Sequence, residues 1–246
     1  MKTGRIFRAS STSDALNQCA KECVKPENCN GLVRYTVPEY GEMVFASQCP
    51  IFERYKQTVQ RQARVEKVLG VLAKHTFRNY DKTKNIKAYE MSRKYVERRA
   101  WEKGGWLILY GGYGTGKTHL LSAIIQEALM LGTYATFANL AKISTMGFDE
   151  AKGELSRLTE YELLGLDDFG IESSQNWLTP HIFKLFDDLN EQKRGLVMTT
   201  NMSLSGLQEL LGERISDRIT ERAIAIELTG ESMRKSLRKD NVSWAE

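Results

Sequence analysis

The residues best suited to chemistry lie in a glycine-rich stretch near the middle of the chain. Residues 107–110 are apolar, and residues 111–118 read Gly-Gly-Tyr-Gly-Thr-Gly-Lys-Thr. This is the G-x-x-x-x-G-K-T pattern of a Walker A loop, whose glycines let backbone N–H groups converge on the phosphates of a nucleotide. We expect Lys117 to lie between the β- and γ-phosphates of ATP and Thr118 to bind Mg²⁺. The residues expected to bind the nucleotide here are Gly111, Gly112, Tyr113, Gly114, Thr115, Gly116, Lys117 and Thr118.

Two adjacent carboxylates follow a second apolar run, and they suit magnesium binding and water activation. Residues 162–170 read Glu-Leu-Leu-Gly-Leu-Asp-Asp-Phe-Gly, which is typical of a Walker B strand. We expect Asp167 to hold the magnesium shell and Asp168 to orient or deprotonate the attacking water. Paired acids are also common on surface loops, but a surface loop would not place them at the end of an apolar run downstream of a phosphate-binding loop.

Two further segments carry polar groups with more than one interpretation. Residues 195–201 form an apolar run that ends in Asn201, whose amide could bond the γ-phosphate or the attacking water, or could serve an ordinary turn. Arg214, Arg218 and Arg222 recur every four residues and would share one helix face, where like charges repel. They either pair with acids three residues further on or meet a phosphate supplied by a neighbouring subunit.

The cysteines indicate a metal site near the N-terminus. All four, Cys19, Cys23, Cys29 and Cys49, lie in the first fifth of the chain. In a reducing compartment, clustered cysteines point to a metal rather than to disulfides. Four thiolates would close a tetrahedral Zn²⁺ site and stabilise a module too small to rely on its core. We therefore expect a zinc-binding module over residues 1–53 that contains a β-hairpin, with an iron–sulfur cluster or unliganded thiols as the alternatives.

The elements that must position these residues follow from hydrophobic periodicity. The run before the phosphate loop predicts a buried strand that stops at Tyr110, and the apolar face after the loop predicts a helix whose dipole points at the phosphates. A plain glycine-rich turn would require neither the buried strand before it nor the helix after it. Asn139 is expected to end a strand and cap the next helix. Further strands are predicted at 133–138, 162–170, 195–201 and 224–228, and further helices at 178–194 and 211–222. This alternation predicts an α/β domain of three layers with a parallel sheet, and with the nucleotide at the carboxyl ends of its strands.

Length and composition fit one such domain and a smaller module. The chain has 246 residues, of which 41% are hydrophobic and 27% are charged. It has no apolar run long enough to span a bilayer and no secretory signal. We therefore expect a cytosolic protein without a membrane partner. The net charge of +4 is too small to identify a nucleic-acid binder. Basic residues dominate residues 54–103, which we expect to form a helical connector. These residues are either solvated helix faces or contacts to a nucleic-acid backbone.

The series of motifs also resembles a known family. Residues 76–234, about two thirds of the chain, resemble the AAA+ ATPase domain of bacterial and phage replicative helicase loaders, the DnaC/DnaI family, and of the related IstB transposition ATPases. The motifs that carry the resemblance are Thr76-Phe77-Arg78-Asn79-Tyr80, Gly116-Lys117-Thr118-His119-Leu120, Asp167-Asp168-Phe169-Gly170, Thr199-Thr200-Asn201, Leu211-Gly212-Glu213-Arg214-Ile215-Ser216-Asp217-Arg218 and Gly230-Glu231-Ser232-Met233-Arg234.

The resemblance implies roles that the motifs alone do not assign. Asn201 looks like sensor 1, Arg218 like an arginine finger that acts on a neighbouring subunit, and Arg234 like sensor 2, while His119 joins the nucleotide-binding residues. AAA+ proteins usually carry Asp-Glu in Walker B, whereas this chain, like many loader relatives, has Asp-Asp. Because Asp168 is one methylene shorter than glutamate, we expect hydrolysis to be slow.

The function that the resemblance implies is that of an ATP-dependent helicase loader. Such a protein binds a hexameric DnaB-type replicative helicase and helps to place it on single-stranded DNA during replication initiation, with ATP and Mg²⁺ as cofactors and with ATP-dependent self-assembly. The AAA+ domain would occupy residues 104–234, followed by a basic tail at 235–246.

DnaI-like members carry a zinc-binding, helicase-docking domain ahead of the ATPase part. The cysteine module therefore favours a DnaI-like loader of a bacterium or a phage, acting in the bacterial cytoplasm. Two alternatives remain. One is an IstB-like transposition ATPase that binds duplex DNA, and the other is an adaptor that binds ATP with little hydrolysis.

Overall fold

A five-stranded parallel sheet carries the phosphate loop and the paired acids at its carboxyl edge. In this computed structural model the strands lie in the order β5-β6-β7-β4-β8, and every neighbouring pair is parallel. The strands are β4 (Trp106–Gly111), β5 (Ala135–Asn139), β6 (Leu163–Phe169), β7 (Gly195–Thr200) and β8 (Ala223–Leu228). The predicted α/β fold with a parallel sheet is confirmed.

The structure describes residues 6–23, 29–170 and 177–230. The chain divides into two compact units, Met1–Ala63 and Arg64–Glu246, with the boundary inside helix α2 (Pro50–Leu69). Within the described ranges, no helix combines the length and the apolar character that a bilayer crossing needs.

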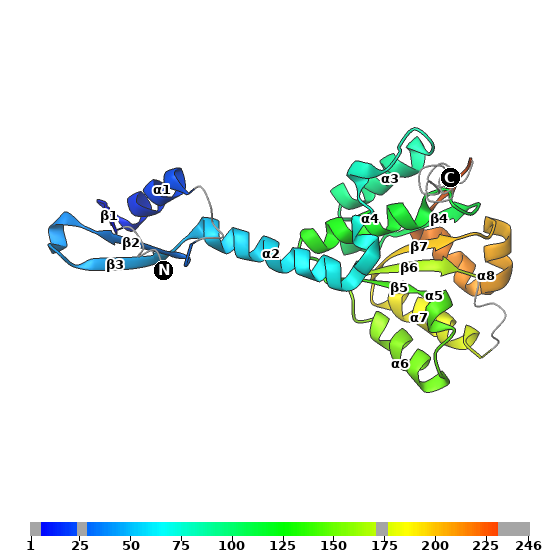
Figure 1. Ribbon diagram of the computed structural model, residues 1–246. Helices are drawn as coiled ribbons and strands as arrows, with labels where there is room; N and C mark the ends of the chain where they lie inside the picture. The colour runs from blue at the N-terminus through cyan, green and yellow to red at the C-terminus, as the bar shows by residue number, and fades with distance from the viewer. Residues whose placement is uncertain (1–5, 24–28, 171–176, 231–246) are drawn as a thin grey trace, which may run out of the picture. The chain divides into compact units, whose positions relative to one another are not determined.

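Helices cover both faces of the parallel sheet and make the three predicted layers (Figure 1). One face packs against α3 (Ile86–Glu97) and α4 (Lys117–Met130), and the other against α5 (Leu140–Ile143), α6 (Phe148–Leu158) and α7 (Thr179–Glu191). Strand β4 shows why both faces must be covered, since Leu107 and Leu109 enter one buried cluster while Trp106 and Ile108 enter the other. Such two-sided burial is the reason that the strand reads as a continuous apolar run.

The stretch ahead of β4 packs into the core of the larger unit. Val65 and Leu69, at the end of α2, are buried in the same cluster as α4. Short 3₁₀ turns follow at η3 (Gly70–Lys74), η4 (Phe77–Asn79) and η5 (Ala100–Lys103). Residues 64–103 of the predicted connector are therefore part of this unit. Ile86 begins helix α3 as its pattern suggested, but its side chain is 56% exposed.

Helix α8 (Leu204–Arg222) starts earlier than the predicted helix at 211–222 and is kinked. Gly212 has φ 71° and ψ 169°, which no helical residue adopts, so two helical segments meet there. A left-handed φ is inexpensive for glycine, which explains why the break falls at this residue. The second segment leads directly into β8, the edge strand.

The N-terminal unit holds a small sheet with a helix on one face. Its elements are β1 (Ile6–Arg8), α1 (Thr12–Glu22), β2 (Leu32–Thr36), η2 (Pro38–Tyr40) and β3 (Val44–Gln48). Strands β2 and β3 pair antiparallel and confirm the predicted hairpin, while β1 adds to β2 in parallel. Figure 1 shows α1 lying over one side of this sheet. The core beneath α1 includes Ala15, Val33, Tyr35 and the buried Cys49.

Candidate nucleotide site

The phosphate loop adopts a backbone that only glycine allows at its key positions. Gly111, Gly114 and Gly116 have φ values of 134°, 75° and 98°. At Gly111 a Cβ atom would also lie 2.2 Å from the carbonyl oxygen of Leu228, so any side chain would collide with the edge strand β8. Gly116 is the N-cap of α4, which places the helix N-terminus against the loop. The loop therefore offers the helix-end N–H groups that bind phosphate.

Lys117 lies inside this loop. Its side chain is 6% exposed, and its Nζ donates to the carbonyl oxygens of Gly111 at 2.8 Å and Gly112 at 2.7 Å. Thr115 closes the same turn by donating its hydroxyl to Gly112 at 3.0 Å. A buried ammonium inside a glycine loop at a helix N-terminus is the arrangement that binds phosphate, so a phosphate group fits this cradle.

Asp167 is the centre of a hydrogen-bond network at the end of β6. Its Oδ1 accepts from the hydroxyl of Thr118 at 2.9 Å and from that of Thr199 at 2.7 Å. Burial raises the pKa of Asp167, and the neighbouring charge of Asp168 adds to the rise, while the hydrogen bonds from Thr199, Thr118 and Asn139 oppose it. A carboxylate and a hydroxyl side by side supply the oxygen ligands that Mg²⁺ prefers, so the donor set fits this ion.

Asp168 has a strained backbone. Its φ is 58°, in the left-handed region, and the pairing between β6 and β7 shifts register between Leu166 and Phe169. The N–H of Asp168 donates to Thr199 Oγ1 at 2.9 Å, which fixes the turn from β7. Such a conformation costs on the order of 1–3 kcal/mol and tends to persist at functional sites.

Asn139 contacts both acids, which the sequence did not predict. The residue caps helix α5 as expected, since its Oδ1 accepts from the N–H of Lys142 at 3.1 Å. Its Nδ2 also donates to Asp167 Oδ2 at 3.5 Å and to Asp168 Oδ2 at 3.4 Å. Because β5 and β6 are parallel neighbours, their carboxyl ends meet, and that adjacency is the signal that could have revealed the contact.

A hollow of about 230 Å³ brings many of the predicted site residues together, although Asp167, Gly111 and Gly112 are not in its lining. Its lining consists of Leu72, His75, Tyr113, Gly114, Thr115, Gly116, Lys117, Thr118, His119, Asp168 and Asn201. Asn201 follows β7, which is a neighbour of β4 in the sheet. Asn201 and Lys117 therefore line the same hollow because of the strand order, which the local sequence does not reveal. Leu72 and His75 come from the turns that precede η4, and no motif identified them. Tyr113 is 75% exposed on the loop.

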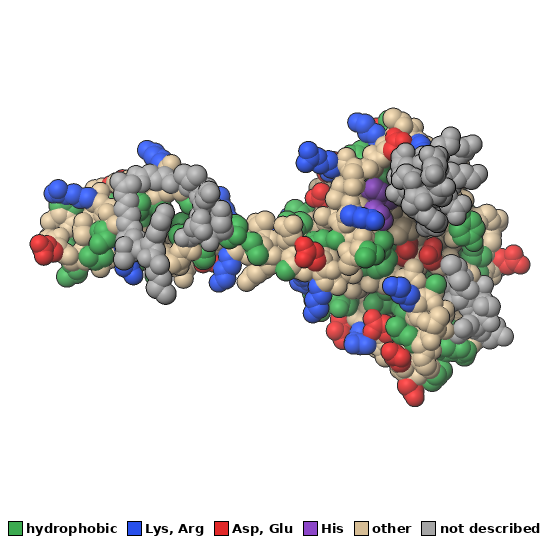
Figure 2. Space-filling model, in the orientation of Figure 1, with side chains coloured by type: hydrophobic (Ala, Val, Ile, Leu, Met, Phe, Trp, Pro, Cys, Tyr) green, Lys and Arg blue, Asp and Glu red, His purple; other side chains and the backbone are tan. Residues whose placement is uncertain are grey.

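His75 and His119 stack beside the phosphate loop, with ring centroids 4.8 Å apart. His119 Nε2 lies 2.9 Å from the carbonyl oxygen of Thr76 and 3.1 Å from Asn79 Oδ1, so its ring anchors the segment before α3. Burial lowers the pKa of both histidines, and the nearby charges of His119 and Lys74 lower that of His75 further. Figure 2 shows histidine side chains at the surface of this unit. A neutral imidazole pair there offers a flat, weakly polar wall.

Of the four predicted arginines, the structure describes the side chain of Arg222 alone. Arg218 lies in the second segment of α8, but its side chain and that of Arg214 are outside the described set, and Arg234 lies outside the described residues altogether. Arg222 is described, and its Nη1 lies 3.0 Å from where a Cβ of Gly104 would be. Since Gly104 precedes β4, Arg222 lies at the amino edge of the sheet, away from the phosphate loop.

The predicted zinc site is not supported. Among the described residues, which include all four cysteines, no three His, Cys, Asp or Glu side chains are grouped so that they could hold a metal ion. Cys19 and Cys49 are hydrogen-bonded neighbours. The pKa of Cys19 is raised to about 11, first by burial, then by the charge and hydrogen bond of Cys49, and last by the charges of Cys23 and Cys29. The thiols share one region, but Cys23 and Cys29 flank a segment outside the described residues and do not complete a ligand set.

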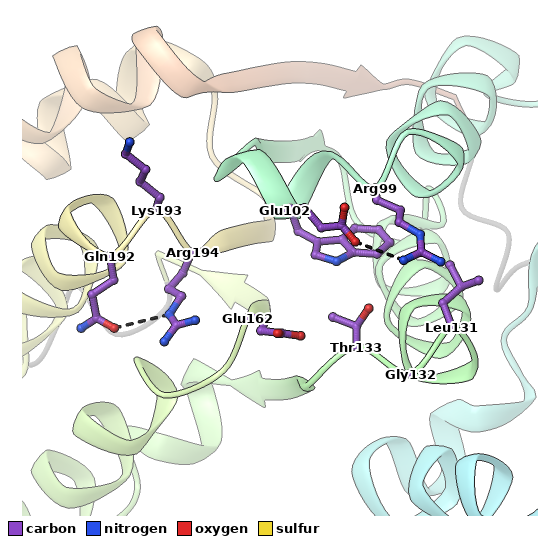
Figure 3. Close-up of a pocket in the computed structure, with 10 residues that line it drawn as sticks. Arg99, Glu102, Leu131, Gly132, Thr133, Glu162, Gln192, Lys193 and Arg194 are labelled. Atoms are coloured by element: carbon purple, nitrogen blue, oxygen red, sulfur yellow. Dashed lines mark hydrogen bonds and ion pairs between the residues drawn. The ribbon is translucent and has the colours of Figure 1, made fainter. Parts of the chain in front are cut away.

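A larger cavity, of about 440 Å³, lies at the opposite edge of the same sheet (Figure 3). Its residues precede strands β4, β5, β6 and β7, so they lie at the amino ends. Four of its five charged side chains have partners within the fold. Arg99 pairs with Glu102 at 3.1 Å, Arg194 donates to Gln192 at 3.4 Å, and Glu162 accepts from a backbone N–H at 2.8 Å. None of the predicted site residues lines it.

Comparison with known proteins adds a family and several relatives. Residues 42–241 match the sequence model described as IstB-like ATP binding protein. The replicative helicase loader DnaC of Escherichia coli K12 is 29% identical over 141 residues, or 54% of this chain and 57% of the loader, so the chain spans a little over half the length of these loaders. The uncharacterized protein YdaV of the same strain is 31% identical over 173 residues, or 65% of this chain and 70% of YdaV.

A crystal structure of the DnaC helicase loader superposes with a TM-score of 0.58 at 21% identity, covering 65% of this chain and 99% of the other. That likeness shows that the larger unit has the same type of fold as this loader.

Proposed function

The chain belongs to the family of IstB-like ATP binding proteins, and on that premise we propose that it is an ATP-dependent helicase loader. In this proposal it binds a hexameric DnaB-type replicative helicase and helps to place it on single-stranded DNA. The observation that carries the ATP-dependent part is the convergence of Lys117, Thr118, Asp168 and Asn201 on one hollow at the carboxyl edge of the sheet. The relatives named as helicase loaders support the helicase part.

Each residue at the hollow has a distinct role in the proposed reaction. Lys117 and the N–H groups of the loop hold the β- and γ-phosphates, and Thr118 and Asp167 hold Mg²⁺, which supplies charge neutralisation to the phosphates when bound. Asp168 accepts a proton from, or orients, the attacking water, with Asn201 beside it. Leu72 and His75 provide the wall for the base. Since an aspartate reaches less far than a glutamate, we propose that hydrolysis is slow until a partner improves the alignment.

We propose that Arg218 completes the site of a neighbouring subunit. Arginine fingers contribute roughly 10³ to 10⁵ in rate in phosphoryl transfer. Arg218→Ala should keep the ATP affinity of the isolated chain while it loses DNA-stimulated or helicase-stimulated hydrolysis and ATP-dependent assembly. Mixing it with Lys117→Ala should restore part of the activity, because each variant keeps the half-site that the other lacks. No recovery, together with weaker ATP binding by Arg218→Ala alone, would show that the arginine acts within its own chain. Arg234 is proposed as a further contact to the nucleotide.

The N-terminal residues 1–53 are proposed to dock the helicase, and the basic residues of 54–103 to contact single-stranded DNA. The test is a loading assay with the replicative helicase of the host, circular single-stranded DNA and an annealed oligonucleotide. The wild-type chain should bind the helicase and increase ATP-dependent strand release, and Lys117→Ala should not increase it. A chain that neither binds the helicase nor increases strand release would contradict the proposal.

The matching family model favours a second candidate, an IstB-like transposition ATPase. That protein would bind duplex DNA in the presence of ATP and recruit a transposase. A duplex and a single strand of equal length, compared by fluorescence anisotropy with ATP, separate the two functions. Stronger binding to the duplex and no binding to the helicase would favour this candidate.

The four cysteines carry a separate proposal, one zinc ion per chain. Its support is the residue type, since four cysteines lie within residues 19–49. Because the described side chains do not form a ligand set, binding would require Cys23 and Cys29 to move towards Cys19 and Cys49. Metal analysis of the purified protein should give about one zinc per chain and a colourless solution. Brown protein with iron would indicate a cluster, and folded protein without metal would end the proposal.

A further inference from the structure

Within residues 6–23 and 29–63, no described element covers one face of the N-terminal sheet. In the registers of β1, β2 and β3, alternate residues point to the same side, and helix α1 with the start of α2 covers only the side of Val33, Tyr35 and Phe45. The other side, called the open face here, consists of Ile6, Arg8, Leu32, Arg34, Thr36, Val44, Ala46 and Gln48. Seven of these eight residues are exposed, and Thr36 is half-buried.

The open face is apolar and basic. Ile6, Leu32 and Val44 are 50%, 43% and 48% exposed, and the registers place one of them on each strand, around Arg34. Arg8 lies across from Thr36, and Arg34 lies between Ile6 and Ala46. Neither arginine has an ion-pair partner within the described part of the chain. The open face contains no acid, since Glu39 and Glu42 lie on the turn between β2 and β3. Figure 2 shows hydrophobic and basic side chains at the surface of this unit.

These properties narrow the kind of partner. If two copies met through this face, Arg8 and Arg34 would lie against the same positive charges of the other copy, and no acidic residue of the face would pair with them. This repulsion opposes self-association through the open face. Single-stranded nucleic acid binds on platforms where aromatic side chains stack on bases, and none of the eight residues is aromatic. An apolar protein surface bordered by Asp or Glu matches both the apolar area and the two guanidinium groups.

We propose that the open face docks an acidic, apolar surface of a protein partner. The inference rests on the proposed function, in which that partner is the replicative helicase, and it names the surface of the N-terminal unit that makes the contact. Ile6, Leu32 and Val44 make apolar contacts around Arg34, and Arg8 and Arg34 pair with carboxylates of the partner.

Charge reversal tests the surface with a matched control. Full-length Arg8→Glu/Arg34→Glu is compared with Lys21→Glu/Lys152→Glu, which makes the same charge change at exposed positions of α1 and α6, outside the open face and the basic stretch. We expect the first variant to bind the purified helicase at least about tenfold more weakly, with less dependence on salt, and the control to bind within about twofold of wild type. A second variant, Leu32→Gln/Val44→Thr, keeps strand-forming residues and should also bind more weakly. Circular dichroism and limited proteolysis check that the unit stays folded.

Each outcome tests either the open face or the proposed function as a helicase loader. Equal helicase binding by wild type and both open-face variants would overturn the surface while leaving the proposed function intact. If the wild-type chain does not bind the helicase at all, the proposed docking fails and this inference fails with it. A selective loss of single-stranded DNA binding or of dimerisation in the open-face variants, with helicase binding unchanged, would assign the face to nucleic acid or to a second copy instead.

Discussion

Two cavities of the larger unit lie at opposite edges of one sheet and differ in the polar groups that line them. The larger, of about 440 Å³, is lined by Arg99, Glu102, Glu162 and Arg194, each held by a neighbour within the fold. The smaller, of about 230 Å³, is lined by Lys117, Thr118 and Asp168, and Nζ of Lys117 donates to the carbonyl oxygens of the glycine loop. The difference teaches that volume does not identify a site, whereas a lysine, a hydroxyl and a carboxylate that meet a helix N-terminus at the carboxyl ends of parallel strands do.

The largest expected effect concerns the catalytic acid of the smaller cavity. Asp168→Asn should lower the rate of ATP hydrolysis by about 10² to 10⁴, since it removes the group that accepts the proton, while ATP affinity changes by less than about threefold. Asparagine tolerates the left-handed backbone, so the fold should survive. Steady-state kinetics and calorimetric titration measure the two quantities, with the exposed Asp149→Asn as control. An unchanged rate would remove Asp168 from the chemistry.

The next effect separates the two cavities directly. Lys117→Ala should weaken ATP binding by about 10², because charge-assisted hydrogen bonds contribute roughly 1.5–3 kcal/mol each. Arg194→Ala alters the larger cavity and should leave ATP affinity within about twofold of wild type. Titration with a fluorescent ATP analogue measures both. The reverse pattern would move the nucleotide to the amino edge of the sheet.

A smaller effect tests the unpredicted contact of Asn139. Asn139→Ala should lower hydrolysis by about tenfold, because the amide no longer orients the two acids, and it should also lose about 1 kcal/mol of stability with the cap of α5. Asn139→Ser keeps a capping side chain and removes the amide, so it should reproduce the kinetic loss with most of the stability intact. If Asn139→Ser hydrolyses ATP normally, the amide does not orient the acids.

The smallest effect is on stability and depends on pH. Burial raises the pKa of Asp167 from its ordinary 3.8, so the folded state binds its proton more tightly than the unfolded state does. The free energy of unfolding therefore falls as the pH rises from 3.8 through the raised value and stays lower above it. Asp167→Asn should raise the Tm at pH 7 by a few degrees, which corresponds to about 1 kcal/mol in the free energy of unfolding. This gain in Tm should become smaller as the pH is lowered. Thermal melts without nucleotide measure this, and an equal gain at every pH would exclude ionisation as the cause.

The sequence predicted the parts of the site that sit on buried elements. Lys117, Thr118 and Asp167 follow apolar runs, and the requirement to bury those runs fixes where the residues emerge. The three-dimensional neighbours of the acids could not be predicted from local pattern. Thr199 bridges Asp167 and Asp168 only because β7 lies beside β6, and His75 reaches the hollow only because the turns before α3 fold against α4.

The N-terminal unit shows the limit of reasoning from residue type. Four cysteines suggested a tetrahedral site, yet metal binding depends on where the thiols lie, and spacing alone does not determine this for a small sheet. The hairpin was predictable because alternating apolar and polar residues show directly which side chains of a strand are buried. The open face was not, since alternating exposed positions do not reveal whether a partner covers them.

The central claim, that ATP lies at the carboxyl edge of the sheet, is tested most directly by photolabelling. The full-length protein is irradiated with 8-azido-ATP and Mg²⁺, and the labelled peptides are identified by mass spectrometry with excess ATP as competitor. The account predicts a competable label on peptides that contain Leu72, His75 or Tyr113, which line the smaller cavity. A competable label on peptides that contain Arg99 or Arg194, from the larger cavity, would contradict it.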